Sequence, residues 1–331
     1  MKKIAVVILN WNGRQLLEEF LPSIVRFSPE ATVYVADNAS SDDSVSFIQT
    51  AFPTVKIIQN TANFGFAKGY NQALQYVEED YYALVNSDIE VTENWLLPIL
   101  ELFEKEPQTS IIQPKILDYK CKDQFEYAGA AGGFLDKYGF PFCRGRIFQS
   151  LEKDTNQYND VIDVFWASGA CFFIRKEVYR KLNGFDEDFF AHQEEIDLCW
   201  RAFNLNYKAR YCGYSTVYHV GGATLDESNP HKTFLNFRNS LWMMLKNLPT
   251  QKLFLVLFLR MVQDGWAMAH FLFQGKPNHV FAVIKAHFYF YLYLFKFLNK
   301  RASKQYSNYY RSNSIVYYRF IKKGKVFENK F

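Results

Sequence analysis

With 331 residues, 49% hydrophobic and 22% charged, the chain can form one large α/β domain with an appendage, and its composition excludes a disordered or fibrous protein. The net charge of +4 is unevenly spread: residues 251–331 hold 14 Lys and Arg against two acidic residues, so this stretch carries +12 and residues 1–250 carry −8. Because aromatic and aliphatic residues lie between these cations, we expect an anionic membrane surface as the partner and no nucleic acid.

Strands and helices alternate over the first 85 residues. The continuous apolar run Ile4 to Leu9 is typical of a strand buried on both faces. Further strands are predicted at 32–36, 55–59 and 81–85, with helices at about 14–27, 43–51 and 66–78. This alternation predicts an α/β fold with a doubly wound, mostly parallel, Rossmann-like sheet.

The regular alternation ends near residue 117. A helix is predicted at about 93–105 and a strand at about 110–117, but residues 120–160 are rich in Gly, aromatic and polar residues, as in a long excursion around a binding cleft. Strand-like segments return within 161–175, a helix is expected at about 194–204, and residues 215–218 again resemble a strand.

The C-terminal part is predicted to be helical, with helices at 234–247, 251–273 and 278–299. Charges at Arg260, Asp264, Lys285 and Lys296 interrupt the apolar runs, which are therefore too short to cross a bilayer. We therefore divide the chain into a catalytic domain, 1–233, and a basic, aromatic-rich helical region, 234–331, that lies on a membrane. A soluble helical subdomain or a dimer interface is the alternative.

The five cysteines favour a reducing compartment, because their number is odd and no two form a Cys-x-x-Cys pair. Together with the basic C-terminal region, they predict a cytoplasmic protein that is peripheral to the inner face of the cell membrane.

Polar side chains follow each predicted strand, where ligands bind in open α/β sheets. They are Asn10 and Asn12 after the first strand, Asp37 after the second, Asn60 and Asn63 after the third, and Asn86-Ser87-Asp88 after the fourth. No Gly-x-Gly-x-x-Gly or Gly-Lys-Ser/Thr sequence follows these strands, which argues against a dinucleotide fold or a P-loop.

Two carboxylates in this set can bind a nucleotide and its metal. Asp37 can accept a hydrogen bond from a pyrimidine N3–H or a ribose hydroxyl, although an Asp here also suits a turn or helix cap. Asp88 can offer an oxygen ligand to Mg²⁺ or Mn²⁺, with a diphosphate supplying further oxygens, although Asn-Ser-Asp also occurs in ordinary turns.

The ordered combination of motifs resembles the family-2 glycosyltransferases with a GT-A fold, especially their rhamnosyltransferase-like branch. The motifs are Asn10-Trp11-Asn12, Asp37 to Asp42, Asn63-Phe64-Gly65-Phe66-Ala67-x-Gly69-Tyr70-Asn71-x-Ala73 and Asn86-Ser87-Asp88. The resemblance continues through Gly169, Gly184-Phe185-Asp186, Glu194 to Arg201 and His219, so it covers about residues 3–222.

By this resemblance, Asp37 would contact the nucleotide base, Asp88 would bind the metal and Glu195 would be the catalytic base. It also implies a donor site that includes Asn10, Asn12, Asn63, Gly65, Asn71, Asn86 and Glu194. The chain departs from the family pattern at Asn86, where stricter motifs carry Asp, and at Glu195, where many relatives carry Asp.

Glu194 and Glu195 also have a purely structural interpretation, because acidic residues stabilise the start of a helix. Asp197 and Arg201, four residues apart, can pair along one helical face. His219 follows the strand-like segment 215–218 and resembles the residue that meets the metal or diphosphate in many GT-A enzymes, although a lone His is often structural.

These observations predict an inverting transferase that moves one sugar from a nucleotide-diphospho-sugar, UDP- or dTDP-linked, to a hydroxyl of a glycan or lipid-linked acceptor. A nucleotidyltransferase would need a Gly-rich basic loop after the first strand, and a processive synthase would need Gln-x-x-Arg-Trp and spanning helices; neither is present. A non-catalytic nucleotide-sugar-binding or scaffold protein of the same fold remains the alternative.

Overall fold

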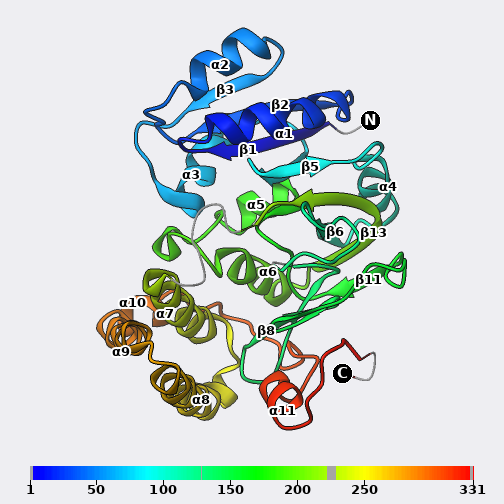
Figure 1. Ribbon diagram of the computed structural model, residues 1–331. Helices are drawn as coiled ribbons and strands as arrows, with labels where there is room; N and C mark the ends of the chain where they lie inside the picture. Colours follow the sequence, from blue (N-terminus) through cyan, green and yellow to red (C-terminus); the bar gives the residue numbers. More distant parts are fainter. Residues whose placement is uncertain (1–2, 128, 222–228, 329–330) are drawn as a thin grey trace.

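A curled mixed sheet forms the centre of the protein, with helices on both faces (Figure 1). The computed structural model describes residues 3–127, 129–221, 229–328 and 331. The strand order is β11-β13-β6-β12-β4-β1-β2-β3, and β5 pairs with β13 outside this path. The α/β prediction is confirmed.

The first half of the sheet is parallel, as the strand–helix alternation predicted. Strands β3, β2, β1 and β4 are neighbours in that order, all parallel. Their bounds, with those of the intervening helices, are β1 Ile4–Asn10, α1 Arg14–Arg26, β2 Ala31–Asp37, α2 Ser44–Ala51, β3 Lys56–Gln59, α3 Gly65–Ala73, the 3₁₀ turn η1 Leu74–Tyr76 and β4 Tyr81–Asn86.

The second half of the sheet is mixed, because β12 (Cys171–Arg175) runs antiparallel between β4 and β6 (Thr109–Asp118). The long strand β13 (Lys208–His219) lies parallel to β6, and β11 (Val161–Val164) lies antiparallel to β13. A short strand that was not predicted, β5 (Ile89–Val91), also pairs antiparallel with β13. The register pairs His219 with both Ile89 and Asp118, which brings the end of β13 beside the chain that follows β4.

Helix α4 (Leu97–Lys105) begins later than predicted, because Asn94 has a positive φ and Pro98 occupies the first turn. Residues 120–160 contain a small antiparallel sheet, formed by β7 (Gly133–Leu135), β8 (Pro141–Cys143), β9 (Arg146–Ile147) and β10 (Ser150–Leu151). Two helices, α5 (Lys176–Lys181) and α6 (Glu194–Asn204), with the 3₁₀ turn η2 (Glu187–Phe189) between them, complete this half.

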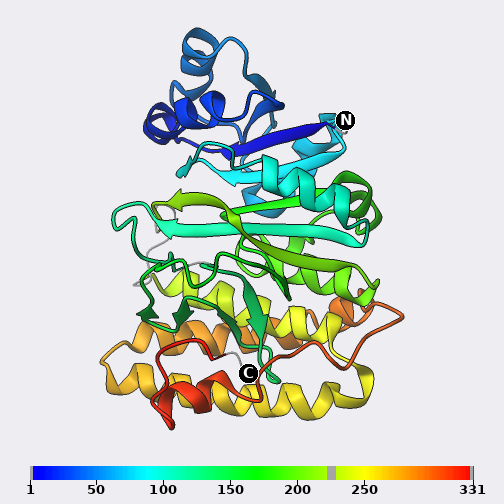
Figure 2. The same ribbon diagram turned by 90° about the vertical axis from the view of Figure 1, so that its right-hand side faces the viewer.

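The C-terminal helices form a layer below the sheet, drawn in yellow, orange and red in Figure 2. They are α7 (Pro230–Asn247), the 3₁₀ turn η3 (Thr250–Lys252), α8 (Leu253–Phe273), α9 (Pro277–Leu292), α10 (Leu294–Leu298) and α11 (Ile315–Phe320). As expected from the interrupting charges, none of the helices in the described residues is both long and apolar enough to span a bilayer.

Two hydrophobic cores lie on opposite faces of the sheet, because successive side chains of a strand point to opposite sides. Ile4, Val6 and Ile8 pack against the side that α1, α2 and α4 cover. Ala5 and Val7 face the other side, which α3 and α6 cover, and this core continues into the C-terminal helices. Trp242 of α7 stacks on Phe297 of α10, with ring centroids 4.2 Å apart, so the C-terminal helices share a core with the sheet.

Candidate active site

The predicted nucleotide-binding residues Asn10 and Asp37 lie side by side at the carboxyl ends of β1 and β2, where they are register partners. The Asn10 amide Nδ2 donates to Asp37 Oδ1 at 3.1 Å, and Asp37 Oδ2 accepts from the Ser40 amide at 3.0 Å. Both side chains are buried. Asp37 therefore organises the turn after β2 at the predicted ligand-binding edge.

Asn12 and Asn63 connect the neighbouring strand-end loops. Asn12, at a φ of +52°, accepts from the Ser41 amide at 2.7 Å, which ties the loop after β1 to the loop after β2. Asn63 accepts from the Asn38 side chain at 3.2 Å and from the Gly65 amide at 3.0 Å. Asn12 and Asn63 are exposed, so their remaining polar atoms face solvent at this edge.

Asn86 and Asp88 lie at the end of β4, next to β1. The backbone N–H of Asn86 donates to the Ala170 carbonyl at 2.9 Å. The buried Asp88 places Oδ1 3.2 Å from His219 Nε2. The other ring nitrogen of His219, Nδ1, lies 3.2 Å from Glu126 Oε1. The structure thus brings together both predicted metal ligands.

The two carboxylates beside His219 favour its protonated form. Burial by itself would lower its pKa, but the interactions with Asp88 and Glu126 outweigh burial and raise the pKa to about 10. No group of three or more His, Cys, Asp and Glu side chains among the described residues is arranged to hold a metal, so Asp88 and His219 are a two-ligand set.

Glu195, in the first turn of α6, lies at the same sheet edge as Asn86. A Cβ placed on Gly169 would lie 3.8 Å from the Glu195 carboxyl carbon, and Gly169 directly precedes Ala170, which binds the Asn86 amide. Burial raises the pKa of Glu195 to about 7, although the residue keeps some solvent exposure. A carboxyl group with this pKa suits proton transfer near neutral pH.

Glu194 differs from Glu195 in its environment. It is buried, its Oε2 atom has no hydrogen-bond partner among the described residues, and burial and the charge of Glu195 raise its pKa well above the usual value. Burial and the neighbouring carboxylate therefore favour the protonated form of Glu194.

The chain just before α6 is strained. Phe190, His192 and Gln193 all have positive φ, between +64° and +73°, although none is glycine. Gly65, at the start of α3, lies against this segment: its φ is +72°, and a Cβ there would come 2.7 Å from the Phe190 ring. Because such strain persists where surrounding structure imposes it, this segment is a functional candidate that the sequence did not indicate.

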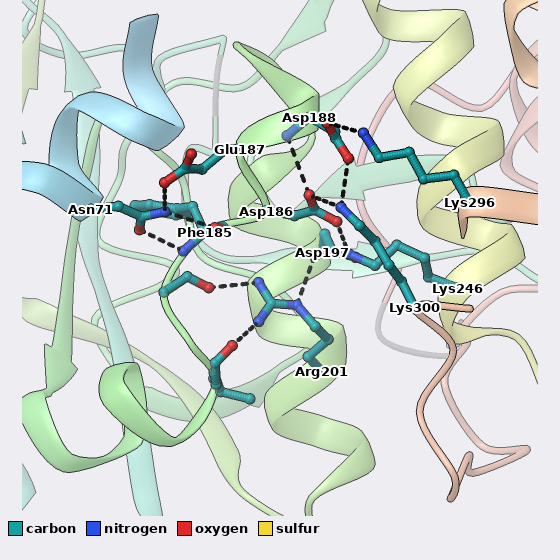
Figure 3. Close-up of polar contacts among 12 residues, drawn as sticks. Asn71, Phe185, Asp186, Glu187, Asp188, Asp197, Arg201, Lys246, Lys296 and Lys300 are labelled. Carbon is teal, nitrogen blue, oxygen red and sulfur yellow. Dashed lines mark hydrogen bonds and ion pairs between the residues drawn. The ribbon is translucent and has the colours of Figure 1, made fainter. Parts of the chain in front are cut away.

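Asn71 occupies a different environment from the other predicted donor-site residues. Its Nδ2 donates to the Phe185 carbonyl at 2.9 Å, and its Oδ1 accepts from the Phe185 amide at 2.9 Å (Figure 3). The same Oδ1 accepts from the Tyr179 hydroxyl at 2.6 Å. Its side chain therefore joins α3 to the segment before η2.

Glu126, beside His219, was missed by the sequence analysis. It lies in the 120–160 excursion, which was expected around a cleft, but no spacing or motif distinguished it from other acidic residues there. We expect the loop after His219 to help determine donor and acceptor specificity, but its residues 222–228 lie outside the described residues.

The fold is that of the GT-A glycosyltransferases. Residues 5–182, more than half of the chain, match the family described as "Glycosyl transferase family 2". The chain belongs to this family and is a glycosyltransferase.

Characterised relatives support the resemblance to the rhamnosyltransferase-like branch. The chain is 23% identical over 235 residues to the N-acetylglucosaminyl-diphospho-decaprenol L-rhamnosyltransferase of Mycobacterium tuberculosis, covering 65% of this chain and 75% of that protein. It is 22% identical to the low-salt glycan biosynthesis hexosyltransferase Agl10 of Haloferax volcanii, covering 84% and 87% of the two chains.

Solved structures share the fold. GalNAc-T7 with UDP, GalNAc and Mn²⁺ has a TM-score of 0.59 at 15% identity, covering 76% of this chain and 49% of that one. The mannosyltransferase PcManGT from Pyrobaculum calidifontis, with GDP-Man and Mn²⁺, has a TM-score of 0.52 at 14% identity, covering 90% and 84%.

Proposed function

We propose that the protein is an inverting glycosyltransferase that moves one sugar from a nucleotide-diphospho-sugar to a hydroxyl of a lipid-linked or cell-surface glycan. The observation that carries this proposal is that the carboxyl group of Glu195, whose pKa is about 7, lies at the same sheet edge as Asp37 and Asp88.

Glu195 acts as the general base. It takes the proton of the acceptor hydroxyl while that oxygen forms a bond to the anomeric carbon, on the face opposite the nucleotide. The bond from that carbon to the diphosphate oxygen breaks, and its electron pair leaves with the nucleoside diphosphate.

Asp88 and His219 would hold a divalent cation once Nε2 of His219 has given up its proton, because only the neutral imidazole binds a metal. Asp88 Oδ1 and His219 Nε2 are 3.2 Å apart, and Glu126 lies behind His219, where it can orient the ring. A Mg²⁺ or Mn²⁺ ion bound there would supply positive charge to the departing diphosphate.

We propose a dTDP- or UDP-sugar as the donor and a polyprenyl-diphosphate-linked glycan as the acceptor. The support for this choice is the named activity of the M. tuberculosis relative and the UDP and Mn²⁺ bound in GalNAc-T7. Asp37, with Asn10, Asn12 and Asn63, would bind the nucleoside end, and Asn86 and Glu194 would face the sugar.

The test compares the wild-type protein with Glu195→Gln. Nucleoside diphosphate release is measured from dTDP-, UDP- and GDP-sugars with Mn²⁺ and a polyprenyl-diphosphate-linked acceptor. We expect Glu195→Gln to lose about 10²- to 10⁴-fold in kcat, because Gln cannot accept the proton. The thermal shift that nucleoside diphosphate causes should stay unchanged.

Glu104→Gln, on the exposed surface of α4, is the matched control and should retain full activity. Normal turnover by Glu195→Gln would exclude Glu195 as the base. Donor binding by the wild-type protein without turnover on any of these substrates would support the non-catalytic alternative.

We also propose that the outer face of α8 and α9 binds the cytoplasmic surface of the cell membrane. Phe254, Trp266 and Phe273 on α8 are 83%, 76% and 91% exposed, and Phe281 and Phe288 on α9 are 67% and 62% exposed. Lys276, Lys285 and several lysines near the C-terminus are exposed as well. Apolar rings with neighbouring lysines suit the interface of an anionic bilayer.

Vesicle sedimentation tests this surface. Replacing Phe254, Trp266 and Phe273 together with Ser should abolish binding to vesicles that contain phosphatidylserine, whereas Tyr76→Ser, at a 70%-exposed ring in η1, should not. Unchanged binding by the triple variant would overturn the membrane proposal. Deleting residues 251–331 is a poorer test, because it removes Phe297 from Trp242 and opens the shared core.

A further inference from the structure

The strained segment before α6 is wrapped around one side chain from the C-terminal helices. Asn239 of α7 is fully buried, and its Nδ2 lies 3.0, 2.9 and 2.7 Å from the carbonyl oxygens of Phe189, Ala191 and His192. An amide nitrogen has only two hydrogens, so these three carbonyls share them and converge on one atom. The curl of residues 189–192 therefore depends on the amide of Asn239.

Arg238 fixes the orientation of this amide and adds a second contact. Its Nε donates to Asn239 Oδ1 at 2.9 Å, which leaves the NH₂ group of Asn239 facing the loop. The Arg238 guanidinium also donates to the Phe189 carbonyl at 3.2 Å. Both groups act on the backbone, so their effect does not depend on which side chains the loop carries.

The same loop sets the position of Glu195. Gln193, with a φ of +73°, is the N-cap of α6, and its carbonyl accepts from the Asp197 amide at 2.9 Å. Each left-handed non-glycine residue costs on the order of 1 kcal/mol, so the chain would relax without its restraints. Since Glu195 lies two residues after Gln193, such relaxation would move its carboxylate relative to the sugar.

The segment on the other side of the loop is also held by the C-terminal helices (Figure 3). Lys246 of α7 is buried and bridges Asp186 at 2.7 Å and Asp197 at 2.8 Å, which links the start of the segment to α6. Lys300, after α10, binds Asp186 and Asp188. With both ends anchored, the strained residues between them are held by Asn239, by Arg238 and by the Phe66 amide, which donates to the Phe190 carbonyl at 3.1 Å; Asn239 alone binds three of their carbonyls.

We infer that Asn239 is a positioning residue for the transfer reaction: it holds residues 189–193 in their strained conformation and thereby places Glu195. This inference rests on the proposed role of Glu195 as the base. It gives the C-terminal helices a part in assembling the site in addition to membrane binding.

The test uses the full-length protein and the variant Asn239→Asp, which keeps the size of the side chain and replaces the two N–H donors with a carboxylate oxygen. We expect kcat to fall about 10- to 100-fold, because misplacing a reacting group by about 1 Å can cost on the order of 100-fold. The number of donor sites per chain should stay unchanged, and the Kd of nucleoside diphosphate should change much less than kcat, since the contacts of Asn10, Asn12 and Asp37 lie within the loops after β1 and β2.

Asn239→Ser keeps one donor and serves as the milder variant if the carboxylate disrupts folding; we expect an intermediate kcat. Ser240→Ala is the matched control, because Ser240 is buried on the same helix and its hydroxyl has no hydrogen-bond partner in the described part of the chain. General destabilisation would lower the number of donor sites together with kcat, whereas misplacement of Glu195 lowers kcat alone.

Two results separate the possible failures. If folded Asn239→Asp and Asn239→Ser keep kcat within twofold of wild type while Glu195→Gln is inactive, the positioning role is wrong and the proposed base stands. If Glu195→Gln is itself active, the proposed function fails first.

Discussion

The loops around Asp37 and the segment around Glu195 meet at one sheet edge, but they are built differently. Around Asp37, the contacts join residues about 25 to 30 positions apart, all from consecutive strand–helix units. Around Glu195, the contacts come from α7 and from Lys300 after α10, 47 to 114 positions along the chain. The donor edge is therefore assembled within the parallel half of the sheet, whereas the base is placed by the C-terminal helices.

The largest effect is expected from the replacement of Lys246. Replacing Lys246 with Met leaves Asp186 and Asp197 buried without their shared cation, so we expect a loss of about 3–5 kcal/mol in the free energy of unfolding, measured with urea. Burial would raise the pKa of Asp186, but the charges of Lys246 and Lys300 outweigh it and hold the pKa at about 2. Lys246, Lys296 and Lys300 form an ion-pair cluster with Asp186, Asp188 and Asp197. A loss below about 1 kcal/mol would show that this cluster does not stabilise the Glu195 side of the site.

The second largest effect is expected on the donor side, from Asp37→Asn. An Asn side chain has only one acceptor oxygen, so it cannot accept from both the Asn10 side chain and the Ser40 amide. The turn and its contact with the nucleoside should therefore weaken. We expect a loss of about 1–3 kcal/mol in donor affinity, measured by calorimetric titration with nucleoside diphosphate. If the loops around Asp37 and the segment around Glu195 are built separately, kcat at saturating donor should change much less than KM.

The ease of prediction followed the same division. Asn10, Asp37 and Asp88 could be found from the sequence because continuous apolar runs end at them, and parallel strands end at a common edge. The antiparallel direction of β12 left no signal, because a buried strand has the same pattern in either direction. The three residues of β5 were too few to show a period.

Glu195 was assigned by resemblance alone, and its supports were not predicted. Phe190 and Gln193 are poor candidates for positive φ by residue type, so the sequence did not predict the strained loop. Asn239 is one of several polar residues of α7, and nothing in the sequence distinguishes it from the others. Its role depends on three carbonyls that only the tertiary fold brings together.

The pH dependence of kcat tests the environment of Glu195 separately from donor binding. A carboxylic acid whose pKa is raised to about 7 is protonated below that pH, so the base form of Glu195 is lost as the pH falls. We expect kcat to fall about tenfold per unit below pH 7, while nucleoside diphosphate affinity between pH 6 and 8 changes little. The check is kcat against pH at saturating substrates; a flat profile down to pH 5 would contradict the assigned environment of Glu195.

The smallest effect is expected from Lys296→Met, although Lys296 belongs to the same cluster as Lys246. Lys296 Nζ lies 2.7 Å from Asp188, but the lysine side chain is 48% exposed and Asp188 keeps a second cation in Lys300. Water therefore solvates either charge when the pair is broken, and we expect a change of about 0–1 kcal/mol in the free energy of unfolding. A loss as large as that of Lys246→Met would mean that the cluster acts as one cooperative unit. A small loss would show that Lys246, the buried cation of α7, rather than Lys296, stabilises the segment around Asp186.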